Sequence, residues 1–334
     1  MFPKRNFILS DILKLHQSIK MPSTSSNAFQ LHQSLAPLIS RYDGFILDQF
    51  GVMHNGKNGL EGAPECVSHL KSLGKKLIIL SNTSSPSEAA LQKLPKLGFE
   101  STDFLGAVTS GEEASRFIKE TYKGPTKVLW FTWKADTQPS PRIFLNLCGD
   151  SIQLLDAKDA IDADLIVTHG SGVVQGATEA MPMTGFMDTG DLSSIQSILE
   201  KCAKKKIPMV CANPDFVVVK PDGSEGHMPG KIANCYESFG GPCTYFGKPH
   251  IPHFQACLRE MDLPNEKVAH VGDSLHHDVA GANEAGIDSV FVAGGVHRSQ
   301  LGADLGVLPE KEDLELLFEK EGQTPTHVVP MFRL

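Results

Sequence analysis

The feature of this sequence that most constrains its fold is a series of short, almost uninterrupted apolar runs that alternate with longer amphipathic segments. The runs predict strands at residues 44–48, 75–82, 126–133, 163–170, 207–213, 243–247, 267–273 and 289–295. Helix-like segments lie between most of them, for example at 63–74 and 250–261. Strands without an alternating polar face are typical of parallel sheets covered by helices on both faces. The sequence therefore predicts an α/β fold, and 334 residues are enough for two domains.

Polar residues follow several of the predicted strands. Ligands bind beyond the carboxyl ends of strands in open α/β sheets, so these positions are candidates for function. Each one alone is more often a turn former or a helix cap. Together they offer three carboxylates, a hydroxyl, an amide and an ammonium group. The candidates are Asp48, Ser81, Asn82, Lys248, Asp273 and Asp278.

This set of side chains suits the transfer of a phosphoryl group to a carboxylate. Asp48 would be the nucleophile and would form a covalent aspartyl-phosphate. Mg²⁺ prefers hard oxygen ligands and fits the cluster of carboxylates. Ser81, Asn82 and Lys248 would bind the other phosphate oxygens and stabilise their charge. The expected substrate is a small phosphorylated metabolite.

Four short motifs in this order resemble those of the haloacid dehalogenase (HAD) superfamily. They are Asp48 with the FGV that begins two residues later, LSNTSS at 80–85, GKPH at 247–250 and VGDSLHHD at 271–278. The long stretch between the second and third motifs leaves room for an inserted cap domain. Further segments resemble the class IIA branch, which includes pyridoxal-, phosphoglycolate- and nucleotide-phosphatase-like proteins. These are VTSGEEA at 108–114, ANPD at 212–215 and PGKIANCYESFGG at 229–241.

The resemblance implies a Rossmann-like core with a parallel sheet and an inserted α/β cap of the C2 type. Its expected division is an N-terminal extension at 1–40, a core at 41–123 and 243–334, and a cap at 124–242. It also implies a Mg²⁺ site formed by Asp48, Asp273, Asp278 and the backbone carbonyl of Phe50. The cap would select the substrate, with Asn213 and Asp215 as candidates, and could form a homodimer. A turn formed by the Asn-Pro-Asp segment is the simpler interpretation of these two residues.

Phe50 departs from the pattern of the resemblance. Phosphatases of this superfamily normally carry an Asp two residues after the nucleophile, which protonates the leaving oxygen and later activates water. General acid–base catalysis contributes about 10²–10⁴-fold, and Phe50 cannot supply it. His54 or a cap residue could replace the acid, or the substrate could need little acid. A surface loop is the simpler interpretation of His54.

Two other functions are compatible with Phe50. Dehalogenase-like hydrolases carry an aromatic residue at this position, since a halide leaves without a proton. They need no magnesium, however, whereas the carboxylates of the fourth motif indicate an intact metal site. The other alternative is a catalytically impaired protein that binds a phosphate ligand. It would have no need of the nucleophile Asp48.

Composition narrows the partners and the compartment. A formal net charge of −8 argues against binding to nucleic acid. The longest apolar runs are far shorter than the roughly 20 residues that span a bilayer, so we expect no membrane insertion. Seven cysteines without a CxxC pair favour reduced thiols in a cytoplasmic protein. The basic, acid-poor residues 1–20 have helical apolar spacing, however, which is also typical of a mitochondrial or plastid presequence.

Overall fold

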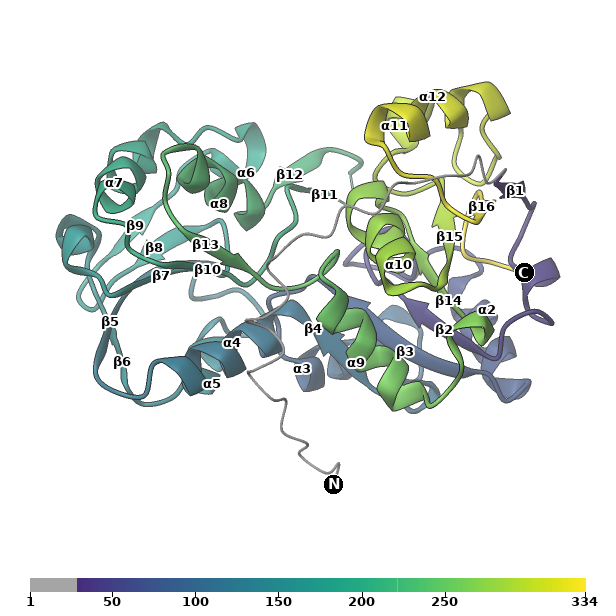
Figure 1. The fold of residues 1–334 in the computed structure, drawn as a ribbon, viewed down its shortest axis with the longest axis horizontal. Coiled ribbons are helices and arrows are strands. Elements are labelled where there is room, and N and C mark those ends of the chain that lie inside the picture. The colour runs from purple at the N-terminus through teal and green to yellow at the C-terminus, as the bar shows by residue number, and fades with distance from the viewer. Residues whose placement is uncertain (1–28, 221) are drawn as a thin grey trace.

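A computed structural model describes residues 29–220 and 222–334 of the chain. The predicted presequence at 1–20 lies outside the described residues. Figure 1 shows two α/β units side by side, one built around a larger parallel sheet and one around a mixed sheet. The chain enters the first unit, crosses to the second and then returns to the first. This arrangement confirms the predicted α/β fold with a parallel sheet.

The first sheet has seven strands within the described chain, and all of its neighbours pair in parallel. Its order is β1 (Gln30–Leu31), β16 (His327–Val329), β15 (Asp288–Val292), β14 (Val268–Gly272), β2 (Gly44–Leu47), β3 (Lys76–Ser81) and β4 (Ala107–Thr109). The central strands β2 and β14 are buried along their whole length. A strand covered on both faces needs apolar residues at successive positions, which explains the uninterrupted runs in the sequence.

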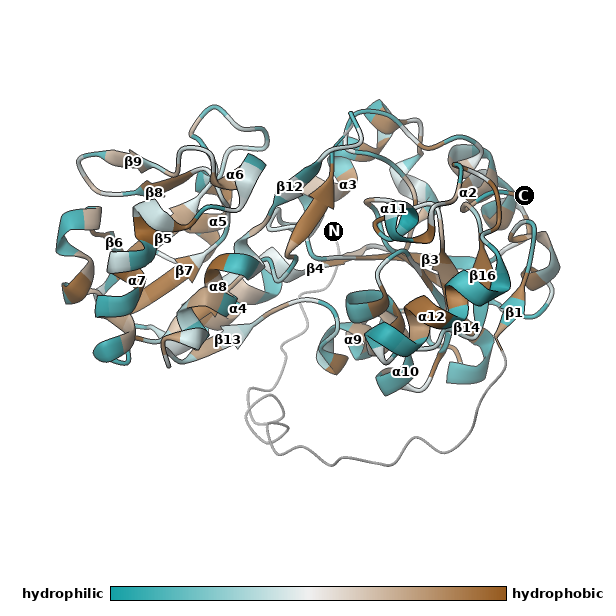
Figure 2. Ribbon diagram, turned by 90° about the horizontal axis from the view of Figure 1, so that it is seen from above, coloured by the Kyte–Doolittle hydropathy of each residue, from teal (hydrophilic) through white to brown (hydrophobic). Residues whose placement is uncertain are grey.

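Helices cover both faces of this sheet. On one face, Phe45 and Leu47 of β2 pack into a cluster with Val67 of α2 (Ala63–Ser72). On the other face, Ile46 packs with Phe254 of α9 (Ile251–Met261). Figure 2 shows the resulting pattern, with brown strands inside and teal residues on the outer helices. The remaining α-helices of the unit are α3 (Ser87–Lys93), α10 (Ala280–Ala285), α11 (Arg298–Leu301) and α12 (Lys311–Glu321).

The second sheet is mixed. Its order is β13 (Cys243–Tyr245), β10 (Met209–Cys211), β7 (Leu165–Thr168), β5 (Thr126–Thr132), β8 (Val173–Gln175) and β9 (Ala180–Pro182), with β6 (Ile152–Leu154) also paired to β5. The strands β8 and β9 run antiparallel to their neighbours. Its helices are α4 (Ser110–Thr121), α5 (Arg142–Leu147), α6 (Phe186–Thr189), α7 (Ser193–Lys204) and α8 (Pro229–Ser238). A short hairpin, β11 (Val217–Val219) and β12 (Glu225–His227), extends from it toward the first unit.

The predicted division of the chain into extension, core and cap differs from the strand pairing and packing at three boundaries. Within the predicted extension, β1 pairs with β16 of the first sheet. The division assigned residues 243–334 to the core, but β13 pairs with β10 in the second sheet. Similarly, Ala114 and Ile118 of α4 pack against Val128 of the second sheet, although they precede the expected boundary at 124. We therefore propose that the cap extends from about residue 110 to about residue 246 by packing.

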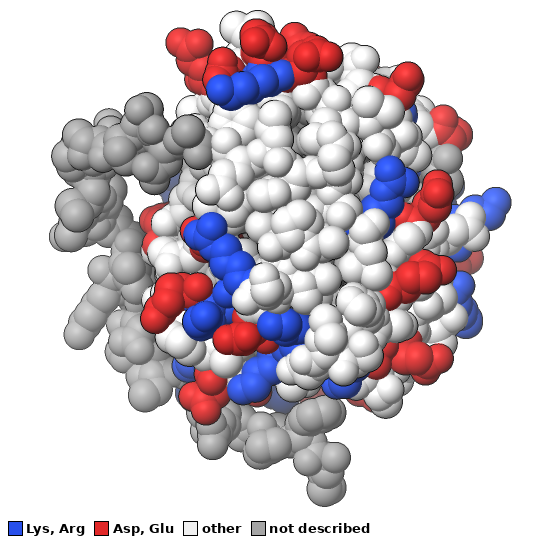
Figure 3. Space-filling view, turned by 90° about the vertical axis from the view of Figure 1, so that its right-hand side faces the viewer, with Lys and Arg blue, Asp and Glu red and all other residues white. Residues whose placement is uncertain are grey.

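The outer surface carries charges of both signs. Figure 3 shows the right-hand end of Figure 1, where acidic and basic side chains border a largely uncharged central area. In residues 29–220 and 222–334, every helix is too short or too polar to cross a bilayer. The exclusion of nucleic acid remains a prediction from the net charge.

Candidate active site

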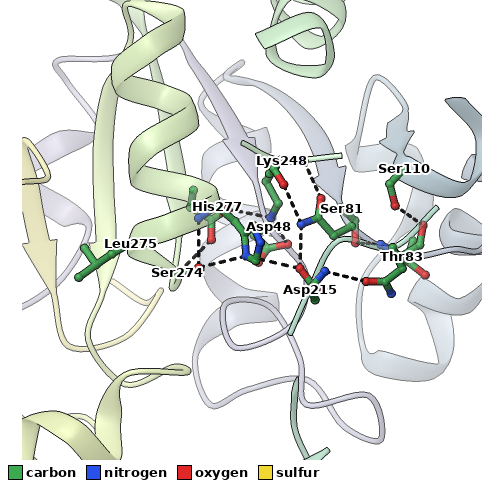
Figure 4. Close-up of polar contacts among 12 residues, drawn as sticks. Asp48, Ser81, Thr83, Ser110, Asp215, Lys248, Ser274, Leu275 and His277 are labelled. Atoms are coloured by element: carbon green, nitrogen blue, oxygen red, sulfur yellow. Dashed lines mark hydrogen bonds and ion pairs between the residues drawn. The ribbon is translucent and has the colours of Figure 1, made fainter. Parts of the chain in front are cut away.

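The predicted site residues come together where parallel strands end. Asp48 directly follows β2 and Asp273 directly follows the neighbouring strand β14, so both lie at the same edge of the sheet. Ser81 is the last residue of β3, on the other side of β2. Lys248 reaches the same point from the loop before α9, and Asp278 reaches it from a π-helical turn (Leu275–Val279) that follows β14. Figure 4 shows Asp48, Ser81 and Lys248 of this group close to Asp215 of the second unit.

Lys248 is the positive centre of the site. Its Nζ lies 2.7 Å from Oδ1 of Asp48 and 2.7 Å from Oδ1 of Asp278, and the side chain is 2% exposed. Burial alone would lower the pKa of this ammonium group, but the two carboxylates raise it above its ordinary value. Burial also raises the pKa of Asp48 to about 6, while Lys248 acts in the opposite direction. Lys248 therefore stays charged and stabilises a carboxylate at position 48.

Asp278 is held in a fixed orientation from several sides. His270 on β14 places its Nε2 2.7 Å from Oδ1 of Asp278, while its Nδ1 donates to the backbone carbonyl of Ile46 at 3.1 Å. The backbone N–H of Ser274 donates to the other carboxylate oxygen at 2.9 Å. Burial opposes ionisation, but Lys248 and His270 outweigh it and hold the pKa of Asp278 well below its ordinary value. This carboxylate is therefore ionised at neutral pH.

The carboxylates of Asp48, Asp273 and Asp278 form a group that fits a metal ion. One oxygen from each lies within 4.8 Å of the others. Burial and the two neighbouring carboxylates raise the pKa of Asp273 well above its ordinary value, against the opposing effects of the Val296 N–H and Lys248. Buried carboxylate oxygens that repel one another are suitable ligands for a hard dication such as Mg²⁺.

The loop that carries Phe50 passes close to this group. Gly51 has a φ of +77°, and a Cβ there would lie 1.9 Å from Oδ2 of Asp273. A residue other than Gly would therefore both strain the backbone and collide with the carboxylate. The close approach is that of Gly51, and the role of the neighbouring Phe50 carbonyl as a metal ligand stays a prediction.

The Phe50 side chain lies away from this chemistry. Its ring is 41% exposed and contacts the His54 ring edge-to-face, with centroids 5.0 Å apart. His54 is buried, not on the surface as the simpler interpretation expected. Burial lowers the pKa of His54 to about 4, and its Nδ1 accepts a hydrogen bond from the Gly56 N–H at 3.1 Å. A neutral ring fixed in this way is poorly suited to replace the missing acid.

Asn82 joins the two units at the site. Its Nδ2 donates to Oδ1 of Asp215 at 2.8 Å, and its Oδ1 accepts from the backbone N–H of Lys248 at 2.7 Å. Ser81 is buried beside it, and its Oγ accepts from the Thr83 N–H at 3.3 Å. The Asn82 amide is thus engaged by protein groups, so we propose that it positions Lys248 and Asp215 and that Ser81 and Lys248 face the phosphate.

Asn213 and Asp215 lie in the loop between β10 and β11. The Asn213 side chain is buried, and its Oδ1 accepts from the backbone N–H of Asp215 at 3.1 Å. This is the Asx turn expected from the sequence, and it shapes the loop. Asp215 itself lies over the first unit, where the His277 Nδ1 is 3.5 Å from its Oδ1.

Two histidines of the site were missed by the sequence reasoning. His270 interrupts the apolar run of β14, and a polar residue in a fully buried strand was the available signal. His277 lies within the fourth motif, and it is buried beside Asp215 of the second unit. Burial lowers the pKa of His277 to about 3. Its environment depends on how the two units pack, and local sequence carries no signal of that.

Comparisons with family models and with known proteins indicate the same family. A haloacid dehalogenase-like hydrolase family model matches residues 45–138, and a HAD-hydrolase-like model matches residues 245–332. The chain is 35% identical to sugar-phosphatase AraL of Bacillus subtilis over 254 residues, which cover 75% of this chain and 83% of that protein.

Solved structures agree in fold. A haloacid dehalogenase-like hydrolase from Brucella suis superposes with a TM-score of 0.68 at 22% identity, covering 90% of this chain and 98% of that one. The p-nitrophenyl phosphatase from Archaeoglobus fulgidus gives 0.59 at 25% identity, covering 87% and 96%. Together with the motifs at the strand ends, these matches show that the chain belongs to the haloacid dehalogenase-like hydrolases, in their class IIA branch.

Proposed function

We propose that this chain is a Mg²⁺-dependent phosphatase that transfers the phosphoryl group of a small phosphorylated metabolite to Asp48 and then to water. The observation that carries the proposal is the pairing of Asp48 with Lys248 at 2.7 Å inside a group of carboxylates at the strand ends. The similarity to a sugar-phosphatase and to a p-nitrophenyl phosphatase supports hydrolysis of phosphoric monoesters.

The protein groups have distinct tasks in this reaction. The Asp48 carboxylate attacks phosphorus, and the bond to the leaving oxygen breaks. The Lys248 ammonium and the Ser81 hydroxyl stabilise the charge on the phosphoryl oxygens. Asn82 holds the Lys248 backbone in place. Hydrolysis of the aspartyl-phosphate by water then returns Asp48 to its carboxylate form and releases phosphate.

Asp48, Asp273, Asp278 and the Phe50 carbonyl would hold the metal ion. When bound, Mg²⁺ neutralises the carboxylates and offsets the charge of the incoming phosphate. The raised pKa of Asp273 supports this assignment, because a dication there would allow that carboxyl to ionise. Dimerisation through the cap and the cellular compartment remain predictions from the sequence.

Removal of metal is expected to abolish phosphate release and to lower the unfolding temperature. Asp48, Asp273 and Asp278 repel one another when no cation is present, and a ligand that binds the folded state stabilises it. The measurement is phosphate release from para-nitrophenyl phosphate, with thermal unfolding in parallel, in a chelator and in added Mg²⁺. In the Asp273→Asn variant, added Mg²⁺ should change neither phosphate release nor the unfolding temperature. In the Asp43→Asn variant, at the opposite end of β2, it should raise both.

The alternatives give different results in the same experiment. A dehalogenase-like hydrolase would act without added Mg²⁺ and would release halide rather than phosphate. A catalytically impaired phosphate-binding protein would bind a phosphate analogue but would release no phosphate from any ester. Phosphate release that does not depend on Mg²⁺ would contradict the proposed metal site.

A further inference from the structure

The proposed reaction lacks an identified proton donor for the leaving group. Phe50 has no ionisable proton. Nδ1 of His54 accepts a hydrogen bond from the Gly56 N–H. Asp48 is the nucleophile, and Asp273 and Asp278 belong to the metal group. Asp215 is a further carboxyl group among the described residues whose contacts reach this site. It is neither the nucleophile nor a proposed metal ligand.

The second unit fixes the backbone of Asp215. Its N–H donates to the Asn213 side chain at 3.1 Å, and its carbonyl accepts from the N–H of Gly230, in the first turn of α8, at 3.0 Å. Gly230 allows this contact because a Cβ there would lie 2.2 Å from the carbonyl oxygen of Pro214. The loop is thus packed closely enough on α8 to give the carboxyl group a defined place.

The first unit fixes one oxygen of the Asp215 side chain and leaves the other available. Oδ1 accepts from the Asn82 amide at 2.8 Å and lies 3.5 Å from Nδ1 of His277. No hydrogen bond to Oδ2 occurs within the described part of the chain, and 29% of the side chain is exposed. Since Asn82 also holds the Lys248 backbone, Asp215 lies one side chain away from the group that contacts the nucleophile. Figure 4 shows Asp215 among the side chains that surround the pair of Asp48 and Lys248.

Burial between the two units raises the pKa of the Asp215 carboxyl group above its ordinary value. The ionisable groups that face it are Asp48, Lys248, His277 and Asp278, all from the first unit. Loss of hydration between the two units raises the pKa of Asp215 to about 6, against the opposing effects of Asn82 and Lys248. Effective general acids and bases have a pKa near the working pH.

We propose that Asp215 is the general acid and base of this enzyme and replaces the carboxyl group that Phe50 lacks. This inference rests on the proposed phosphatase function. In the first step, Asp48 forms its bond to phosphorus, the bond to the leaving oxygen breaks, and that oxygen takes the proton of Asp215. In the second step, the Asp215 carboxylate takes a proton from water as the water oxygen bonds to phosphorus. The bond between Asp48 and phosphorus then breaks, and both carboxyl groups return to their starting forms.

The variant Asp215→Asn tests whether Asp215 donates a proton, while it preserves the hydrogen bond from Asn82. Its amide oxygen can still accept from Asn82, but it cannot donate an acidic proton. With saturating Mg²⁺, kcat/KM on an alkyl substrate, glycerol phosphate, should fall by about 10²-fold or more. The loss on para-nitrophenyl phosphate should be less than about tenfold, since nitrophenolate leaves with little help from an acid. The matched control, Asp188→Asn, changes an exposed carboxylate of the second unit and should alter neither substrate.

The pH profile gives an independent readout. For the wild-type protein, kcat/KM on glycerol phosphate should fall above about pH 6, where the free enzyme loses the Asp215 proton. The Asp215→Asn variant should lack this decline. Equal losses on both substrates with the decline retained would overturn the proposal and leave Asp215 as a latch between the units. A wild-type protein that releases no phosphate from either substrate would overturn the proposed function, and this inference with it.

Discussion

Asp48→Asn is expected to lower the rate of phosphate release by about 10⁴-fold or more, because it removes the atom that attacks phosphorus. The side chain keeps its shape, and its amide oxygen can still accept a hydrogen bond from Lys248. Therefore the protein should remain folded and should still bind a phosphate analogue. The measurement is single-turnover and steady-state phosphate release with para-nitrophenyl phosphate and Mg²⁺, with circular dichroism to verify the fold.

The control for this variant is Asp43→Asn, just before the other end of the same strand. Asp43 is 52% exposed and pairs with Lys75 on the surface, so its loss should leave turnover unchanged. Wild-type turnover in the Asp48→Asn variant would contradict the aspartyl-phosphate mechanism. Loss of turnover together with loss of the fold would instead assign Asp48 a structural role.

The sequence indicated which of these side chains would lie close together, because their positions depend on strand ends. Parallel strands present their carboxyl ends at one edge, so Asp48 and Asp273 had to lie together once β2 and β14 were neighbours. The apolar runs themselves located both strands, since a strand covered on both faces has apolar residues at most positions.

The contacts between the two units could not be predicted in the same way. The hydrogen bond between Asn82 and Asp215 joins residues 133 positions apart, and it exists only because one unit lies over the other. His277 is buried by the same contact. The segment 243–247 carried a strand pattern, but a strand of three residues does not specify which sheet it joins. Its pairing with β10 is therefore a result of tertiary packing.

Short strands were missed for a related reason. β4 and β16 each have three residues, which is too few for an apolar run to stand out from a loop. β4 nevertheless positions Thr109, whose side chain accepts from the Glu112 N–H and begins α4. Such strands are stabilised by their neighbours in the sheet, so their signal lies outside their own residues.

Lys248→Met is expected to destabilise the protein by about 3–5 kcal/mol in the absence of metal, the usual result of breaking a buried ion pair from one side. Lys248 is 2% exposed and contacts Asp48 and Asp278, so its loss would leave two buried carboxylates beside Asp273 without a cation. The unfolding temperature should fall by about 5–15 °C, and phosphate release should be lost. The measurement is thermal unfolding in a chelator, repeated with Mg²⁺, which should restore part of the loss because it supplies positive charge to the same carboxylates.

Two further variants show whether loss of the Lys248 charge causes the expected loss of stability. Lys220→Met removes an ion pair with Asp188, whose carboxylate is largely exposed, and should leave the unfolding temperature nearly unchanged. Asp278→Asn added to Lys248→Met removes one of the unpaired charges and should recover part of the lost stability in the chelator. If the Lys248→Met variant unfolds at the same temperature as the Lys220→Met variant, Lys248 does not hold these carboxylates together. If the double variant is less stable than Lys248→Met alone, the cost comes from packing around the lysine stem and not from the charge that it balances.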